Sequence, residues 1–530
     1  MGKGGISQIA VVLFVTVCAL VQPIYAKYSG GSGEPNDPYQ IANVADLLLL
    51  AEEVNDYNKC FILTADIDLD PCLPGGQVFT TAVIAPDLNN ANLDYFEGTP
   101  FTGIFDGAGY KVSNLIINTN GNKGDYLGLF GYVIGGEIKN LGLQNISIND
   151  GNDSCFIGGL VACNVFGNII NCFSIGTVTG GDYSYYLGML VGYNEQGNIS
   201  KCYSKGTITG TGHECIGGLV GSSFGATFNT SINNCFSTVN VTGGDYSEAL
   251  GGLAGWSGGS INNCYATGAV TGGINSYSWA LGGLAGGNQG DINNCFATGA
   301  VTSMLDYSRY LGGLVGWSDG GISNCFSTGD VTGGAYSACL GGLVGTNGGV
   351  SINDSYSTGS VSGGDYSGCL GGLVGYSGGS ISNCYSTGAV SGSSDVGGLV
   401  GYSGGSISSS YFLITSGPAN GYGTPLTDAQ MKQQSSFVGW DFVNGPNDVW
   451  TIKEDVNYPV LVWPLVNLVS SRFPFGWYEV DFIDLADMAN WWGRDDCTTN
   501  DDCGGADFDF SGTMDIVDLD AMCSYWLEGS

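Results

Sequence analysis

The apolar positions of this chain fall in short runs of two to six residues, separated by glycine, serine and asparagine. Runs of that length are typical of β-strands, and no stripe with the 3.6-residue spacing of a helix continues through the glycines. The string Gly-Gly-Leu-Val-Gly, or a near copy, returns about every 30 residues, which is the mark of a repeat architecture. Each copy follows an aliphatic residue, at Leu127, Ile157, Leu187, Ile216, Leu250, Leu281, Leu311, Leu340, Leu370 and Val396.

One such repeat carries too little apolar surface to bury itself, but a stack of repeats buries a continuous core. With about three short strands in each repeat, every repeat forms one coil that rises about 4.8 Å, the spacing of paired strands. The pattern therefore predicts an all-β solenoid with parallel strands, and residues 101–415 are assigned to it.

Stacked repeats place equivalent residues in columns. A second string, Ile-x-Asn-Cys-Tyr/Phe, repeats a cysteine at Cys172, Cys202, Cys235, Cys264, Cys295, Cys325 and Cys384, with Ser355 and Ser410 in the equivalent places. The next residue forms an aromatic column: Phe173, Tyr203, Phe236, Tyr265, Phe296, Phe326, Tyr356, Tyr385 and Tyr411. Neighbouring residues of a strand face opposite ways, so we expect cysteine inside, the aromatic residues outside or at a corner, and the preceding asparagines stacking their amides there.

These cysteines do not have the arrangement of a zinc site, which needs clustered soft ligands, because they come one to a coil without an accompanying histidine. Cys339 and Cys369 form a shorter second column on neighbouring coils. Their spacing is within disulfide range, but parallel side chains are poorly aimed, so we expect them to be unpaired.

The Gly-Gly-Leu-Val-Gly strings resemble the GLUG motif of bacterial surface proteins and of some large secreted peptidases. The lead-in resembles the opening coils of such β-helices, from Asp37-Pro38-Tyr39 through Phe101-Thr102-Gly103-Ile104-Phe105-Asp106-Gly107. The resemblance covers roughly residues 30–465 and implies a right-handed parallel β-helix at the cell surface, often in adhesins. It implies no catalytic residues. The peptidases that carry the motif need His-Glu-x-x-His, and this chain has one histidine, His213.

A solenoid needs caps over its open ends. Residues 27–100 are assigned to an N-terminal cap and the first coils, with an amphipathic helix over residues 42–54. Residues 416–465 are assigned to a C-terminal cap with a helix over residues 425–436, followed by Trp440, Trp450 and the apolar run to Trp463 as bulky cover.

Composition narrows the class of partner. The chain has 92 glycines but only 13 prolines and no collagen period, and its net charge is −35. Such a surface repels phosphate backbones and anionic head groups, which argues against nucleic acid and acidic membranes as partners. Residues 1–26 read as a secretory signal peptide, with Lys3 before an apolar run too short to span a membrane. We therefore expect a secreted or cell-surface protein of bacterial type without a membrane span.

The C-terminal segment, residues 466–530, predicts a small α-helical module with a calcium loop. Oxygen ligands fall at the spacing of an EF-hand-like loop, and Gly512 makes its turn. The ligands are Asp507, Asp509, Ser511, Thr513, Asp515 and Asp518. Upstream, Val480–Leu485 imitates the second half of such a loop, but Phe473, Phe475 and Trp477 stand where ligands should be.

The duplicated loop and helix resemble a dockerin, in which two repeats bind calcium and dock on a cohesin. The imperfect first repeat leaves its calcium, and binding of a cohesin-like partner, open. Cys497 and Cys503 bracket an acidic linker and could close it as a disulfide.

Binding has more support than catalysis in the sequence. An aromatic residue follows the Leu-Val-Gly turn at Tyr132, Tyr193, Trp256, Trp317, Tyr376 and Tyr402. If exposed, these residues could stack on an extracellular glycan or contact a surface protein; otherwise they shield the corners of the solenoid. The alternative is a polysaccharide hydrolase or lyase, which needs carboxylates converging on one groove. Its candidates, Asp182, Asp245, Asp306 and Asp365, recur at one position of the repeat, as turn residues do.

Overall fold

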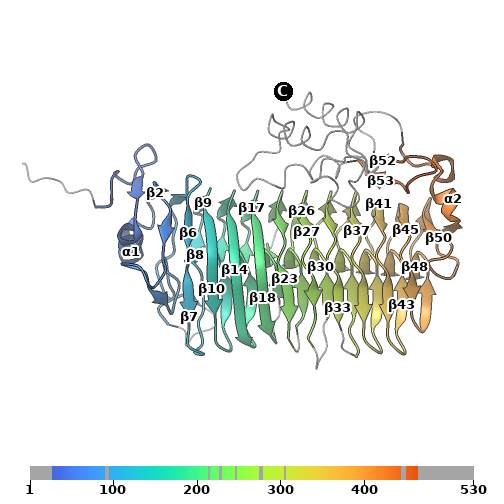
Figure 1. Cartoon of the computed structure of the whole chain (residues 1–530), viewed down its shortest axis with the longest axis horizontal. Helices are drawn as coiled ribbons and strands as arrows, with labels where there is room; N and C mark the ends of the chain where they lie inside the picture. The colour runs from blue at the N-terminus through green and yellow to red at the C-terminus, as the bar shows by residue number, and fades with distance from the viewer. Residues whose placement is uncertain are drawn as a thin grey trace, which may run out of the picture.

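The structure is a long stack of parallel β-strands with a short helix at each end, α1 (Val44–Glu52) and α2 (Asp428–Met431) (Figure 1). It is a computed structural model that describes residues 27–89, 95–212, 215–225, 230–244, 247–273, 279–303, 306–442 and 449–462. The strands run across the long axis, and each coil follows the previous one along it. The predicted parallel β-solenoid is confirmed.

Three sheets run along the stack, here called sheets 1, 2 and 3. Sheet 3 has ten strands, one from each coil of the repeat region, and sheet 2 has nine. Sheet 2 consists of β11 (Cys155–Gly158), β15 (Tyr185–Gly188), β19 (Cys215–Gly217), β24 (Ala249–Gly251), β29 (Ala280–Gly282), β34 (Tyr310–Gly312), β39 (Ala338–Gly341), β43 (Gly368–Gly371) and β47 (Ser394–Gly397). Sheet 3 consists of β8 (Phe130–Ile134), β12 (Val161–Val165), β16 (Val191–Glu195), β20 (Val220–Phe224), β25 (Ala254–Ser257), β30 (Ala285–Asn288), β35 (Val315–Ser318), β40 (Val344–Asn347), β44 (Val374–Ser377) and β48 (Val400–Ser403).

Sheet 1 takes up the rest of each coil. In one coil it contributes β26 (Ser260–Asn262), β27 (Tyr265–Ala266) and β28 (Val270–Thr271), and in a later coil β41 (Ile352–Ser357) and β42 (Val361–Gly363). A coil therefore has four or five strands rather than about three. The additional breaks are corners where residues such as Asn263 adopt a left-handed backbone with φ of +53°.

The glycines of the repeated string make the tight turn from sheet 2 to sheet 3. At Gly371, a Cβ atom would collide with the backbone carbonyl of Val374 and with the backbone of Gly401 on the next coil. The turn is too close to both for a side chain. The repeat of glycine is thus a steric requirement of the coil.

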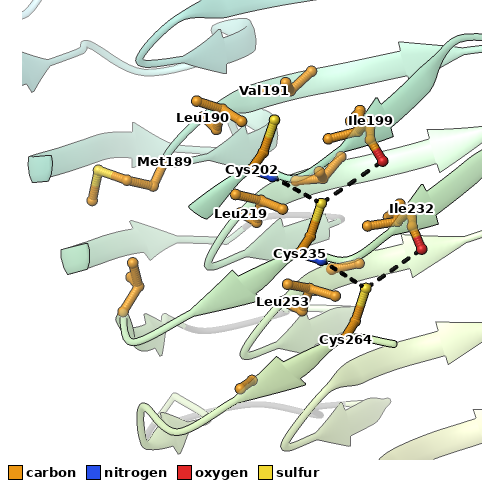
Figure 2. Close-up of a cluster of buried hydrophobic side chains, with 14 of the residues drawn as sticks. Met189, Leu190, Val191, Ile199, Cys202, Leu219, Ile232, Cys235, Leu253 and Cys264 are labelled. Carbon is orange, nitrogen blue, oxygen red and sulfur yellow. Dashed lines mark hydrogen bonds between the residues drawn. The ribbon is translucent and has the colours of Figure 1, made fainter. Parts of the chain in front are cut away.

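The core is a column of aliphatic residues with the cysteine column beside it. Leu250, Leu281, Leu340 and their equivalents are fully buried, and the seven cysteines of the column are at most 1% exposed. Figure 2 shows three of these cysteines one above the other, with Leu219 and Leu253 beside them. The predicted inward direction of the cysteines is confirmed.

The cysteine column is also a hydrogen-bond ladder. The backbone N–H of Cys202 donates to Cys235 Sγ at 3.4 Å, and that of Cys235 donates to Cys264 Sγ at 3.3 Å (Figure 2). Each thiol donates to the carbonyl two residues earlier, as Cys264 does to Asn262 at 3.1 Å. Every cysteine in the described residues is free of disulfide bonds.

The predicted aromatic column lies on the outer face of sheet 1. Its rings from Tyr203 to Tyr385 stack face to face, with centroids 4.8 to 5.0 Å apart and planes within 5° of parallel. The asparagine amides at the corner also form a ladder, as Asn294 donates to Asn263 at 3.0 Å and Asn324 to Asn294 at 3.3 Å. The rings and amides thus repeat the register of the coils, as predicted.

The N-terminal cap is built around α1. Asn43 caps this helix by accepting a hydrogen bond from the N–H of Asp46 at 3.1 Å, and Leu47 and Leu50 are buried in the solenoid core. A 3₁₀ helix follows at Val54–Asp56, and the first paired strands are β1 (Tyr39–Ile41) and β2 (Cys60–Leu63).

The C-terminal cap differs from the expectation in two ways. The helix predicted over residues 425–436 is only four residues long, because β51 (Thr424–Leu426) continues the stack and Thr427 begins α2 with a capping box. The bulky residues do not all close the end of the stack. Trp450, on β52 (Trp450–Thr451), packs on Tyr356 and Tyr385, so this hairpin with β53 (Val460–Leu461) covers the side of sheet 1.

Candidate functional site

The six aromatic residues predicted as a ligand-binding row lie in one column on the outside of sheet 3. Along the column, one small residue lies between each aromatic residue and the next: Cys163, Ser222, Gly287 and Thr346. Tyr376 and Tyr402 are the exception, because they lie on consecutive coils. The column contains Tyr132, Tyr193, Trp256, Trp317, Tyr376 and Tyr402, and we call it, with the aromatic residues that contact it, the sheet 3 strip. Ten coils at about 4.8 Å make the strip roughly 40 Å long.

Alternation with small residues lets the large rings lie over the sheet. A Cβ atom at Gly287 would collide with the ring of Trp256, so this indole lies against the backbone of the next coil. Trp256 and Trp317 approach each other across that coil, with centroids 5.4 Å apart and planes 22° from parallel. Trp279 lies 6.3 Å from Trp317 and is 38% exposed. The middle of the strip is therefore a group of partly exposed indoles.

A second column of aromatic residues lies beside the first near the N-terminal end. Phe156 and Tyr186 have left-handed backbones, with φ of +61° and +58°, and Tyr186 contacts Tyr193 at 5.0 Å. Burial raises the pKa of Tyr132 and Tyr193 to about 12, so their hydroxyls stay protonated at neutral pH.

Several members of the strip were not predicted from the sequence. They are Phe96, Tyr126, Phe156, Trp279 and Tyr422, which contact the column or its neighbours. For Tyr126 and Phe156 a signal existed, since each directly precedes the aliphatic residue that opens a repeat. Phe96, Trp279 and Tyr422 lie in irregular segments, where the period gives no guide.

The outer ladder on sheet 1 offers a different kind of surface. Each inner ring has both faces covered by rings about 4.9 Å away, as Phe236 lies between Tyr203 and Tyr265. From Phe296 to Tyr411 the C-terminal cap buries the ladder, and Tyr385 donates a hydrogen bond from its hydroxyl to Pro459 O at 2.6 Å. Stacked rings leave only their edges for a ligand, so this ladder stabilises the coil stack.

A third ladder lies on the turns before sheet 2. Tyr336 stacks on Tyr307 at 4.8 Å and on Tyr366 at 4.9 Å, and all three are exposed with left-handed backbones. Tyr366 is the last ring of this short stack, and its side chain is 70% exposed.

The recurring turn carboxylates do not converge on one groove. Asp182, Asp306 and Asp365 are exposed on different coils, and Asp306 accepts a hydrogen bond from the backbone N–H of Ala335 at 3.1 Å. Asp245 lies outside the described residues. Within the described ranges, no three or more histidine, cysteine or acidic side chains gather so that they could hold a metal ion. The carboxylate of Asp306 therefore connects two neighbouring coils.

One of several buried acids, Asp150, has a strongly raised pKa. Asp150 accepts hydrogen bonds from Ser154 Oγ at 2.7 Å and from the N–H of Gly151 at 2.8 Å. Burial nonetheless raises its pKa to about 7. The groups that donate these hydrogen bonds belong to the same turn as Asp150, so its carboxyl stabilises the turn.

Several predicted features lie outside the described residues. These are the signal peptide, His213, the pair Cys497 and Cys503, and the calcium ligands from Asp507 to Asp518. In the part of the chain that the structure describes, no helix has the length and hydropathy needed to cross a bilayer.

Comparison with known families identifies the repeat. Six segments match the family model of the GLUG motif, at residues 183–209, 212–242, 246–271, 277–302, 307–332 and 366–391. The resemblance expected from the sequence is therefore confirmed for the solenoid: the chain carries GLUG repeats.

Two curated proteins are similar to part of the chain. Halomucin of Haloquadratum walsbyi is 37% identical over 155 residues, which is 28% of this chain but 2% of halomucin. A protein of Evansella cellulosilytica, provisionally described as a Gly-rich membrane protein, is 32% identical over 165 residues, covering 28% of this chain and 17% of the relative. The chain thus spans only a small part of the relatives that it matches.

A solved structure from Bacteroides ovatus, provisionally described as an immunoglobulin A1 protease, aligns with 82% of this chain and 96% of its own. The TM-score is 0.34 and the identity 20%.

Proposed function

We propose that this protein is a secreted or cell-surface scaffold, of the adhesin kind, that binds an extracellular glycan or a surface protein along the sheet 3 strip. The observation that carries the proposal is the alternation of large rings with small residues on sheet 3. It keeps Trp256 and Trp317 on the surface of the coil stack, partly exposed and held in place by neighbours. Rings that are already ordered lose little entropy when a ligand stacks on them.

A neutral glycan is the ligand that suits the strip best. The chain carries a net charge of −35, and Arg309 is the one lysine or arginine between Lys205 and Lys432. Acidic polymers would be repelled, whereas the apolar faces of neutral sugar rings need no counter-charge. A strip of roughly 40 Å suits an extended polymer.

The location and the attachment are part of the same proposal. GLUG repeats and the similarity to halomucin and to a Gly-rich membrane protein support a place outside the cell. The predicted calcium loop from Asp507 to Asp518 would stabilise a dockerin-like tail that attaches the scaffold to a cohesin-like partner.

Affinity electrophoresis in gels that contain galactomannan, arabinoxylan or mixed-linkage glucan tests the binding site. We expect at least one of these neutral polymers to retard the full chain, and polygalacturonate to leave its mobility unchanged. The double variant Trp256→Ala, Trp317→Ala should lose the retardation. Tyr366→Ala is the matched control, because it removes an exposed aromatic ring of a different ladder.

Retardation that survives in the double variant would refute the strip as the binding site. A reducing-sugar assay on the same polymers distinguishes the alternative function. Sugar released by the full chain, and abolished by one Asp→Asn change, would establish a polysaccharide-degrading enzyme in place of a scaffold.

A further inference from the structure

Cys339 and Cys369 lie directly opposite each other on consecutive coils. On β39 and β43, the residues before and after them pair in register, Ala338 with Gly368 and Leu340 with Leu370. Both cysteines have left-handed backbones, with φ of +58° and +56°, and both are partly exposed. Cα atoms on neighbouring strands, about 4.8 Å apart, are within the range that a disulfide spans.

The two thiols lie beside each other on sheet 2, close enough for each to shift the pKa of the other. The backbone of Cys339 also lies against sheet 3, where a Cβ atom at Gly375 would be 2.6 Å from Cys339 C. The pair is therefore a neighbour of the sheet 3 strip at Tyr376.

The buried cysteine column differs from this pair in its exposure to solvent. Cys295 and Cys325 are also on consecutive coils, but they are fully buried and donate their thiol protons to Asn293 O and Ser323 O, each at 3.1 Å. Sulfur atoms that solvent cannot reach are inert toward a reagent in solution.

The surroundings of Cys339 favour its thiolate. The neighbouring Cys369 thiol and the positive charge of Arg309 lower the pKa of Cys339 to about 7. Arg309 is the one lysine or arginine between Lys205 and Lys432, and its positive charge stabilises the Cys339 thiolate. In contrast, the hydrogen bond with Cys339 raises the pKa of Cys369.

We propose that Cys339 and Cys369 are a site of thiol–disulfide exchange that closes into a disulfide between adjacent coils. The co-substrate is a small-molecule or protein disulfide. The Cys339 thiolate attacks one of its sulfurs, which breaks that S–S bond, releases one thiol and leaves a mixed disulfide on Cys339. The Cys369 thiolate then attacks Cys339 Sγ and releases the second thiol, so that two protein thiols are oxidised and one disulfide is reduced to two thiols.

The closed bond would join β39 and β43, two neighbouring coils of sheet 2, through a covalent bond. We expect a higher melting temperature for the oxidised chain than for the reduced chain, and no such difference in Cys339→Ser.

The full chain, reduced and freed of reductant, is the material for the test. It is incubated with oxidised glutathione at pH 8, blocked with N-ethylmaleimide and digested with chymotrypsin. The expected product is a peptide pair linked through Cys339 and Cys369, lighter by two hydrogen atoms than the reduced peptides. Cys295 and Cys325 are the internal control and should carry the maleimide only after denaturation.

Two variants sharpen the result. Arg309→Gln should slow the reaction at pH 7 by about threefold to tenfold, because it removes the cation that favours the thiolate. Cys295→Ser should leave the linkage unchanged. Blocked thiols at Cys339 and Cys369 after incubation, glutathione adducts that never resolve into the linked pair, or equal linkage of Cys295 to Cys325 would each overturn the proposal.

Discussion

The backbone N–H of Cys235 donates a hydrogen bond to Cys264 Sγ, 3.3 Å away on the next coil. The same sulfur donates its proton to Asn262 O at 3.1 Å. Both contacts lie at the corner where Asn263, with φ of +53°, separates β26 from β27. The thiol thus pairs the N–H of Cys235 and adds a second donor to Asn262 O, which also accepts from the N–H of Asn234. Ser410 repeats the arrangement with Cys384 N–H at 3.2 Å and Ser408 O at 2.8 Å.

The first prediction concerns Cys264. Serine keeps both hydrogen bonds, so Cys264→Ser should leave the free energy of unfolding within about 1 kcal/mol of the wild type. Cys264→Ala leaves the N–H of Cys235 and the carbonyl of Asn262 buried without this partner, and should cost about 1–3 kcal/mol. Guanidinium unfolding of the two variants, monitored by circular dichroism, measures the difference.

Cys163 provides the opposite case on the same chain. It is buried among apolar groups beside Tyr132 and Tyr193, in register with both. There alanine should be tolerated better than serine, because a hydroxyl is costly in an apolar site. An alanine variant at Cys264 that is as stable as the serine variant would show that the ladder hydrogen bonds contribute nothing.

The second prediction concerns the close approach of Gly287 to Trp256. Gly287→Ala introduces a Cβ atom where the indole ring lies, so it should destabilise the chain by about 1–3 kcal/mol and weaken glycan binding. In a Trp256→Ala background the same change should cost less than about 0.5 kcal/mol, because the clash is gone. A double-mutant cycle by chemical unfolding measures this coupling.

Gly404→Ala is the control for the cycle. The only atom within 4 Å of its new Cβ is Ser377 O, at 4.0 Å, and the backbone is not left-handed, so we expect a change within about 0.5 kcal/mol. Equal penalties for Gly287→Ala with and without Trp256 would mean that the ring moves aside at no cost.

The repeat made much of the fold predictable. Period and residue size alone placed Leu250 and Cys264 inside and Tyr265 outside, because a stack in register allows few other arrangements. Cysteine exchanges with serine in the column, and the structure shows that both share a hydrogen-bond pattern. That pattern depends on the left-handed corner at Asn263, which the order of residues does not reveal.

The candidate site was predictable only in part, for a similar reason. The column from Tyr132 to Tyr402 follows the period and was found from the sequence. Glycine is needed at position 287 because the ring of Trp256 lies over it. The direction in which that ring points cannot be read from the sequence. The position of Trp450 on Tyr385, at the side of sheet 1 and not over the end of the stack where cover was expected, depends on how an irregular segment folds back.

The third prediction concerns pH. Asp150 titrates at about 7 in the folded chain and near 3.9 when unfolded, since burial favours the neutral acid. The folded pKa is the higher one, so its stabilisation is fully present below pH ~4 and is lost as pH rises through about 7. The loss is on the order of 4 kcal/mol.

Asp150→Asn keeps an oxygen that accepts from Ser154 and Gly151 but cannot ionise. Relative to the wild type, we expect the variant to have a similar melting temperature at pH 4 and a higher one at pH 8. Asp365→Asn, at an exposed turn acid, should not separate the two curves. A wild type that is no less stable than Asp150→Asn at pH 8 would mean that the buried carboxylate ionises without penalty.

The fourth prediction concerns the calcium loop, which follows from the sequence alone. Six oxygen ligands at the spacing of Asp507 to Asp518, with Gly512 at the turn, should bind one calcium ion, and calorimetry on the full chain should detect one site. Asp507→Ala should abolish it, whereas Asp501→Ala, in the acidic linker before the loop, should not. Two sites would mean that the segment around Asp481 and Asp484 also binds calcium, despite the aromatic residues at its first three ligand positions. Heat of binding that persists in Asp507→Ala would instead assign the ion to the general negative charge of the chain, and the dockerin-like attachment would lose its main support.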